Sequence, residues 1–326
     1  MSTRQDNQTL LGKISDLMKR EHYSVNTERA YSDWIKQFVK FHCLQARESL
    51  FVEAENKVEK FLTYLATERD VSASTQNQAF NALVFLYKRV LEMPLENVRA
   101  TRSRKEARIP VVLTREEVKQ VLPLLDGVPE LVVKLLYGSG LRITEAVRLR
   151  VQDLDFGFKQ VTVRNGKGMK DRATPFPEIL AGPLHNHLEK MKMIHEKDLM
   201  QGYGTVYLPY ALDRKYPNAE CEWNWQFVFP GRGLSKDPRS GTIRRHHVDQ
   251  SVINKAIKKA VRKLGIYKKV SAHTFRHSFA THLLQRGTDI RTIQSLLGHK
   301  DLETTMIYTH VLKQGGEGVE SPLDDL

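Results

Sequence analysis

Three short stretches near the end of the chain carry side chains that could transfer a phosphoryl group. They contain His273 and Arg276, then His299, then Tyr308. A guanidinium can hold a phosphate, an imidazole can accept a proton and a phenol can attack phosphorus, so these residue types supply an anion site, a base and a nucleophile. The pattern indicates phosphoryl transfer that needs no metal.

A helix that begins near Ser271 must position the first of these stretches. Phe275, Phe279 and Leu283 recur at i, i+4 and i+8, which is the spacing of one packed helix face. His273 and Arg276 are three residues apart, so their side chains project side by side and away from that stripe. We expect one face of this helix to be packed and the other to be chemical.

A further arginine stands at an expected helix start. Residues 131–137 predict a helix that Gly138 and Gly140 stop, and residues 141–145 then begin another helix. Arg142 and Glu145 have the i, i+3 spacing of an ion pair. Taken alone, such a pair is usual on a solvated surface and contributes little.

A hairpin is expected between these two regions. Residues 161–164 alternate as a strand, Asn165 and Gly166 are typical of a tight turn, and residues 170–174 can return as the partner strand. Lys167 and Lys170 therefore both lie near the tip, and their spacing alone does not separate them.

The first hundred residues predict a small helical bundle. Apolar residues follow the i, i+3, i+4, i+7 stripe in four segments between residues 10 and 98. Polar side chains on the other faces, among them Gln76 and Asn77, could bind phosphates and base edges or form an ordinary solvated surface.

Residues 99–110 hold five basic residues and one acidic residue, which predicts an extended linker along a phosphate backbone. A capping box, Thr114 with Glu117, opens the second domain.

Charge and composition indicate a polyanionic partner in a reducing compartment. The chain has 51 basic and 38 acidic residues, for a net charge of +13, and binding to phosphates would release counterions. Two cysteines far apart predict neither a disulfide framework nor a zinc site. The polar N-terminus and the lack of a long apolar run favour a cytoplasmic protein without a membrane segment.

Taken together, the motifs resemble the signature of the tyrosine recombinases. The match to the family in order and spacing covers His273-x-x-Arg276, Gly298-His299 and a tyrosine nine residues after that histidine. It also covers Gly138-Ser-Gly140-Leu-Arg142-x-x-Glu145. The resemblance implies a mainly α fold with a small β-sheet: a helical core-binding domain at residues 1–98, a basic linker at 99–110, and a mixed α/β catalytic domain at 111–326.

The resemblance also implies a mechanism. Tyr308 would attack a DNA phosphate to give a 3′-phosphotyrosine, Arg142 and Arg276 would hold the phosphate oxygens, and Lys167, directly after the turn glycine, would protonate the leaving 5′ oxygen. His273 would act as base or phosphate ligand, and His299 would bind a phosphate oxygen or the nucleophile. No cofactor, metal or ATP is expected. A homotetramer would exchange strands through a Holliday junction.

One segment resembles the insertion that marks integron integrases. Residues at about 191–227 are rich in aromatic and basic residues, begin with an expected helix at 191–200, and exceed what Xer-type recombinases carry at this place. Aromatic side chains here could stack on extrahelical bases of a folded single-stranded site, or could only pack the insertion onto the domain. The acidic tail, residues 314–326, would not fold by itself; the resemblance suggests that the segment around or after Tyr308 docks on a neighbouring subunit.

The sequence therefore predicts an integron integrase that captures gene cassettes. The alternatives are a Xer-type recombinase that resolves double-stranded sites, a type IB topoisomerase, and a non-catalytic DNA-binding protein. The candidate DNA-binding residues are Gln76, Asn77, Arg102, Arg104, Lys105, Trp223, Trp225, Arg244, Arg245, His246 and His247.

Overall fold

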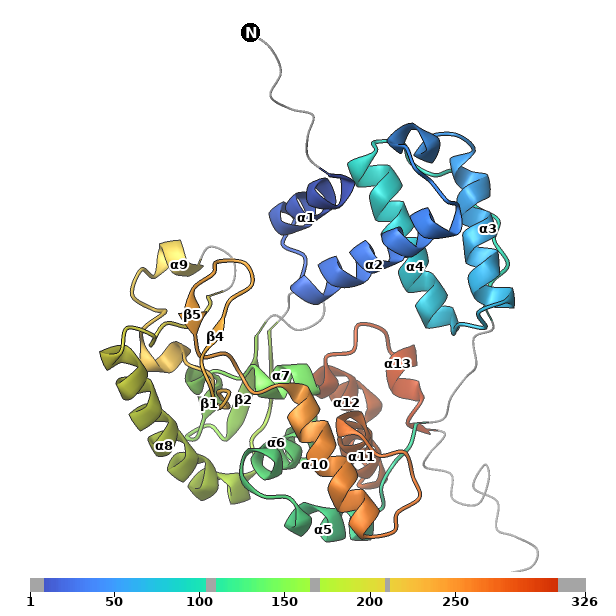
Figure 1. Ribbon diagram of the computed structural model, residues 1–326. Helices are drawn as coiled ribbons and strands as arrows, with labels where there is room; N and C mark the ends of the chain where they lie inside the picture. Colours follow the sequence, from blue (N-terminus) through green and yellow to red (C-terminus); the bar gives the residue numbers. More distant parts are fainter. Residues whose placement is uncertain (1–8, 104–109, 165–170, 209–211, 310–326) are drawn as a thin grey trace, which may run out of the picture. The chain divides into compact units, whose positions relative to one another are not determined.

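The computed structural model describes residues 9–103, 110–164, 171–208 and 212–309 (Figure 1). Contacts divide the chain into an N-terminal unit, residues 1–108, and a C-terminal unit, residues 109–326. Each unit has its own apolar core. Lys167, Lys170, Arg104, Lys105 and the tail at 314–326 lie outside the described residues.

The N-terminal unit is a helical bundle, as predicted. Side-chain oxygens of Thr9, Ser24 and Ser72 accept backbone N–H groups at three helix starts, which satisfies donors that a helix leaves open. The buried hydroxyl of Tyr87 donates to the carbonyl of Leu50 at 3.0 Å. The elements are α1 Leu10–Arg20, α2 Val25–Phe41, a 3₁₀ turn Arg47–Leu50, α3 Ala54–Thr67, α4 Ala73–Phe85 and a π turn Leu86–Val90.

Gln76 does not lie on a solvated polar face of this bundle, contrary to the prediction. Its side chain is 1% exposed, and its amide donates to the carbonyls of Leu62 and Thr101 at 2.9 and 2.7 Å. Its amide oxygen accepts the N–H of Ser103 at 3.0 Å. Gln76 therefore ties the segment after the bundle to α3 and α4, and the prediction of a solvated, DNA-facing Gln76 is wrong.

The C-terminal unit is mixed α/β. Its first helix has the predicted capping box, with Thr114 and Glu117 bonding each other's backbone N–H at 3.1 and 2.7 Å. The helices are α5 Arg115–Val121, α6 Gly127–Ser139, α7 Ile143–Val147, α8 Ala181–Met200, α9 Leu212–Lys215, α10 Gln250–Lys263, α11 Ala272–Gln285, α12 Ile290–Leu297 and α13 Glu303–Met306. Short 3₁₀ turns cover Leu122–Leu124, Val151–Asp153, Glu178–Leu180 and Trp223–Trp225.

Two small antiparallel sheets complete this unit. The strands are β1 Leu154–Asp155, β2 Gln160–Val163, β3 Arg172–Pro175, β4 Ser235–Lys236 and β5 Ile243–Arg244, in the orders β1-β2-β3 and β4-β5. In the first sheet Val163 pairs with Arg172, so the predicted hairpin is present. Its turn, residues 165–170, lies outside the part of the chain that the structure describes.

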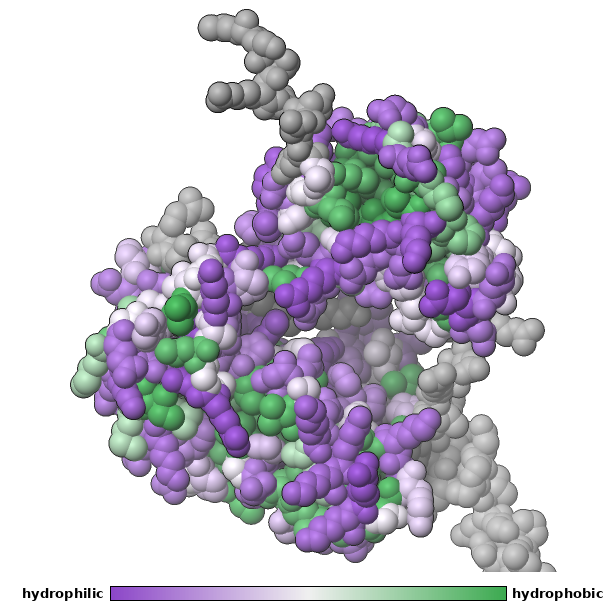
Figure 2. Space-filling model, viewed as in Figure 1, coloured by the Kyte–Doolittle hydropathy of each residue, from purple (hydrophilic) through white to green (hydrophobic). Residues whose placement is uncertain are grey.

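The core of this unit lies where α6, α10 and α11 pack side by side (Figure 1). The helix α6 continues through Gly138 and ends at Gly140, whose φ is +63°. The predicted stop at Gly140 is therefore confirmed, and a stop at Gly138 is wrong. On α11, Phe275 is fully buried and Arg276 is only 3% exposed, whereas His273 is exposed. Figure 2 shows a hydrophilic surface over α10, whose five cationic side chains are all exposed.

The insertion is held to the core through backbone carbonyls. The buried guanidinium of Arg150 donates to the carbonyls of Trp225 and Tyr207 at 2.5 and 2.8 Å, and it stacks 4.9 Å from the ring centre of Phe227. The helix predicted at 191–200 is the second half of α8, which begins at Ala181. No helix within the described residues is long and apolar enough to span a membrane.

Candidate active site

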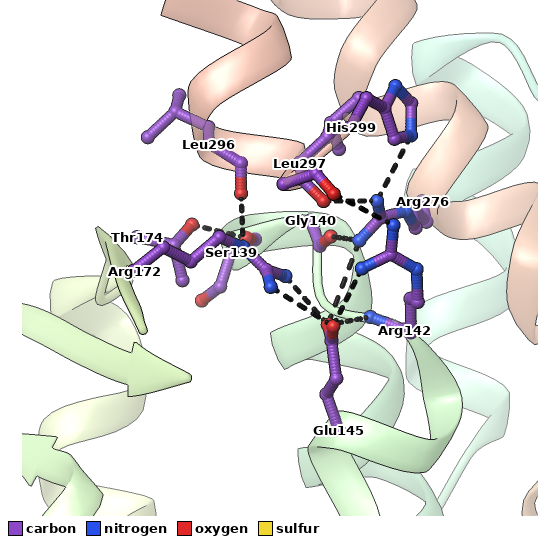
Figure 3. Close-up of polar contacts among 11 residues, drawn as sticks. Ser139, Gly140, Arg142, Glu145, Arg172, Thr174, Arg276, Leu296, Leu297 and His299 are labelled. Carbon is purple, nitrogen blue, oxygen red and sulfur yellow. Dashed lines mark hydrogen bonds and ion pairs between the residues drawn. The ribbon is translucent and has the colours of Figure 1, made fainter. Parts of the chain in front are cut away.

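Three arginines from three elements meet at one carboxylate (Figure 3). The Glu145 carboxylate accepts hydrogen bonds from the Arg142 guanidinium at 2.8 Å and from two nitrogens of Arg172 at 3.0 and 2.7 Å. A nitrogen of Arg276 lies 3.8 Å from it. Three cations around one anion leave an excess of positive charge, so the cluster can bind a further anion such as a phosphate.

These guanidiniums also donate to backbone carbonyls, two of which belong to glycines. Arg276 donates to the carbonyls of Gly140 and Leu297 at 2.5 and 2.6 Å, and Arg142 donates to the carbonyl of Gly298 at 3.2 Å. Gly298 has φ +61°, and a Cβ there would lie about 3.0 Å from the Arg172 guanidinium. Glycine fits this left-handed position, which explains the Gly-His motif physically.

Burial and charge perturb the pKa values of this cluster. Burial alone would raise the pKa of Glu145, but the hydrogen bonds and charges of Arg172 and Arg142 outweigh it, and the pKa is lowered. Burial, with the charge of Arg142, lowers the pKa of Arg276 to about 10. At neutral pH the Arg276 guanidinium and the Glu145 carboxylate are therefore both ionised.

His299 links the arginines to Tyr308. Its Nε2 lies 3.2 Å from Arg276 and its Nδ1 lies 2.9 Å from the hydroxyl of Thr305. Burial, followed by the charges of Arg276 and Arg142, lowers the pKa of His299 to about 4. A neutral His299 therefore accepts from Arg276 and donates to Thr305. Its ring is nearly parallel to that of Tyr308, with ring centres 6.3 Å apart.

Tyr308 is buried, and its hydroxyl contacts a histidine. The residue is 1% exposed, and its hydroxyl lies 3.0 Å from Nδ1 of His277. Burial raises the pKa of Tyr308, while Arg276 and Arg142 oppose that rise. His273, one turn earlier on α11, keeps an exposed edge. Partial burial of its ring, followed by the charges of Arg276 and Arg142, lowers its pKa.

The structure thus brings together five of the six predicted catalytic residues: Arg142, His273, Arg276, His299 and Tyr308. The sequence analysis did not find Arg172, His277 or Thr305 as members of the site. Arg172 stands in the returning strand of the predicted hairpin, and His277 directly follows the His273-x-x-Arg276 motif in the sequence. Only the fold shows that Arg172 reaches Glu145 and that His277 reaches Tyr308.

The predicted DNA-binding residues of the insertion are engaged within the chain. Trp223 packs against His195 with ring centres 5.8 Å apart, and Trp225 packs against Tyr216 at 6.0 Å. Both indoles are half-buried. Arg244 is 8% exposed.

The neighbouring residues are held in the same way. Arg245 donates to both carboxylate oxygens of Asp198 at 2.6 and 2.8 Å. His246 is half-buried, and His247 packs edge-on against Phe227. In the N-terminal unit, Asn77 is exposed, and Arg102 lies 5.1 Å from the ring centre of Phe80.

Comparison with known proteins identifies the family. Residues 111–315 match the phage integrase family, and residues 10–97 match the phage integrase N-terminal SAM-like domain. An integrase/recombinase of Escherichia coli is 48% identical over 318 residues, covering 97% of this chain and 94% of the relative. Tyrosine recombinase XerA of Pyrococcus furiosus is 32% identical over 307 residues, covering 93% and 89%.

Solved structures share the fold. The XerH site-specific recombinase bound to palindromic difH substrate aligns with a TM-score of 0.58 at 20% identity, covering 92% of this chain and 82% of that one. The Tn1549 transposon integrase in complex with transposon right end DNA aligns with a TM-score of 0.59 at 16% identity, covering 97% and 96%. These alignments confirm the predicted fold class.

The chain belongs to the phage integrase family. It is therefore a site-specific tyrosine recombinase, an enzyme of DNA strand exchange that needs neither ATP nor a metal ion.

Proposed function

We propose that Tyr308 is the nucleophile and that the arginine cluster holds the scissile DNA phosphate. The observation that carries this proposal is the convergence of Arg142, Arg172 and Arg276 on Glu145 beside the buried Tyr308. Arg142 retains 23% exposure of its side chain, so it can turn part of its guanidinium toward a phosphate. Guanidinium groups fixed before the reaction stabilise the charge of the transition state without reorganising.

Lys167 and His273 complete the proposed set. Lys167, which stands between β2 and β3 in the sequence, protonates the departing 5′ oxygen. His273 is exposed beside Arg276 and Arg142 and binds a phosphate oxygen. Attack by Tyr308 forms the 3′-phosphotyrosine and releases a 5′ hydroxyl, and attack by the hydroxyl of a second strand reverses the step.

Replacing Tyr308 by phenylalanine tests the nucleophile. Tyr308→Phe removes only the attacking oxygen and keeps the ring that packs on His299, so the variant should fold and bind DNA. Incubation with a nicked duplex site should give no protein–DNA adduct on a denaturing gel, while wild type accumulates one. Adduct at the wild-type level would remove Tyr308 from this role.

The biological role that we propose is that of an integron integrase acting as a homotetramer on folded single-stranded attachment sites. Support comes from the insertion at 191–227, in which Trp223 and Trp225 keep part of their rings exposed. Such rings can stack on extrahelical bases. Arg102, Arg104 and Lys105 of the linker would contact phosphates, and the tail at 314–326 would dock on a neighbouring subunit.

A Xer-type recombinase is the second candidate, and the 32% identity with XerA favours it. One comparison separates the two roles. Trp223→Ala should weaken binding to a hairpin with extrahelical bases several-fold and leave binding to a fully paired duplex unchanged. Equal losses on both substrates, or none, would favour the Xer-type role. The melting temperature of the variant must be measured beside these affinities, because Trp223 also packs on His195.

A further inference from the structure

The hydrogen bond between Tyr308 and His277 is not used by the reaction steps proposed above. His277 is one helical turn after His273 on α11, so the two imidazoles lie on the same side of that helix. Its Nδ1 lies 3.0 Å from the tyrosine hydroxyl, which is a normal hydrogen-bond distance. A group in direct contact with the attacking oxygen can take part in its deprotonation.

The ring of Tyr308 is fixed by its surroundings. His299 lies nearly parallel to it, and Phe279, Ile293 and Leu297 form the apolar cluster in which it is buried. The hydroxyl is therefore directed by packing toward His277. This arrangement resembles a nucleophile with an adjacent base, which is how a weak nucleophile such as a phenol is activated.

We propose that His277 accepts the proton of Tyr308 during strand cleavage; this rests on the proposed role of Tyr308 as nucleophile. The O–H proton of Tyr308 moves to Nδ1 of His277 while the tyrosine oxygen bonds to phosphorus. The bond from phosphorus to the 5′ oxygen breaks, and that oxygen takes a proton from Lys167. In the rejoining step His277 returns its proton to the tyrosine oxygen as the phosphotyrosine bond breaks.

The electrostatics around His277 agree with this role. Burial, followed by the charges of His273 and Arg276, lowers the pKa of His277 to about 4. The imidazole is therefore neutral at neutral pH and has a lone pair available. The titratable groups that face it are His273 and Arg276 on α11, together with His299 and Tyr308. A DNA phosphate bound by Arg276 adds a negative charge that raises the pKa of His277, so the base gains strength only when substrate is present.

The test replaces His277 by asparagine, which keeps a hydrogen-bond acceptor near the tyrosine hydroxyl but cannot act as a base. Full-length protein in excess over a nicked duplex site gives the single-turnover rate of adduct formation. We expect His277→Asn to bind DNA like wild type and to cleave at least about a hundredfold more slowly at pH 7, the size typical of general-base catalysis. Its rate should rise about tenfold per pH unit up to pH 9, as hydroxide produces the tyrosinate.

The chain offers a matched control on the same helix. His282 makes an equivalent contact, with Nδ1 at 2.9 Å from the hydroxyl of Tyr137. His282→Asn should therefore keep the wild-type cleavage rate and pH profile. Melting curves of both variants check folding. His277→Gln is a second variant with an amide at the same position, and it should show the same slow, pH-dependent cleavage.

A modified substrate separates the base from the acid. A sulfur atom in place of the bridging 5′ oxygen leaves without a proton. The sulfur substrate should therefore restore cleavage by the Lys167→Ala variant and not by the His277→Asn variant. Four outcomes for His277→Asn would each overturn the proposal. They are a cleavage rate within about threefold of wild type, a rate faster than wild type, a loss of rate that does not change with pH, and rescue by the sulfur substrate. Adduct formation by Tyr308→Phe in the same experiment would instead show that the nucleophile itself is misassigned.

Discussion

Removing the charge of Glu145 should destabilise the C-terminal unit, and added anions should restore part of that stability. Glu145→Gln keeps the shape of the side chain but leaves Arg142, Arg172 and Arg276 close together without a counter-charge. The side chain of Glu145 is 12% exposed, so solvent screens this repulsion only in part. A phosphate bound by the same arginines would replace the missing charge.

The structure sets the size of the effect. Removing one partner of a buried ion pair costs about 3 to 5 kcal/mol, and three arginines share this carboxylate. For a unit of roughly 200 residues, each kcal/mol lowers the melting temperature by about 2 to 4 °C. We expect the melting temperature of Glu145→Gln to fall by roughly 6 to 20 °C.

Thermal melting with and without inorganic phosphate provides the assay. Phosphate should raise the melting temperature of Glu145→Gln more than that of wild type. Glu130→Gln is the control: Glu130 pairs with Lys134 on the surface of α6, with 34% of its side chain exposed, and its loss should cost less than about 1 kcal/mol. Equal effects of the two substitutions, or no extra stabilisation by phosphate, would refute the reasoning.

The pH dependence supplies a second check on Glu145. Its pKa in the folded protein lies below the usual value of 4.5, so its contribution to stability is present above that pH. The contribution is lost as the pH falls through the lower pKa of the folded state. The difference in melting temperature between wild type and Glu145→Gln should therefore shrink in acid.

Three further outcomes follow from the same structure. Arg276→Lys should bind DNA but form the protein–DNA adduct at least about a hundredfold more slowly than wild type. A lysine ammonium cannot contact a phosphate while it also reaches the carbonyls of Gly140 and Leu297. A near-normal rate of adduct formation would contradict this. Gly140→Ala should cost about 2 to 4 kcal/mol in denaturant unfolding, because φ is +63° and the new Cβ would lie 2.4 Å from Phe279. Gly182→Ala on α8, which meets nothing within 4 Å, should be neutral or stabilising. Duplex binding followed by fluorescence anisotropy should weaken with salt by a log–log slope of about −0.9 per neutralised phosphate, and a flat response would argue against phosphate contacts.

Much of the fold was predictable because its signals are local. The apolar stripes of the N-terminal helices, the Thr114 capping box and the pairing of β2 with β3 each depend on residues close together in the sequence. The start of α8 was missed because Gly182 and Pro183 suggest a loop. Proline is tolerated in the first turn of a helix, where its missing N–H has no partner to lose.

The site was predictable in its residue types and not in its contacts. Motif spacing pointed to Arg276 and Tyr308, but it could not show which histidine lies against the tyrosine hydroxyl. His273 and His277 differ by one helical turn, and packing of the chain after α12 decides between them. Gln76 was misjudged for a similar reason, since the backbone carbonyls that satisfy it come from α3 and from the segment after the bundle.

The attachment of the insertion through Arg150 has a consequence for how this chain can diverge. The guanidinium holds carbonyl oxygens at positions 207 and 225, and every amino acid supplies such an oxygen. Side chains at these positions can therefore be exchanged without removing the anchor, whereas loss of Arg150 itself would remove the guanidinium donor of both carbonyls. The outer surface of the insertion could therefore change over many substitutions, as long as an arginine remains at position 150 to hold it in place.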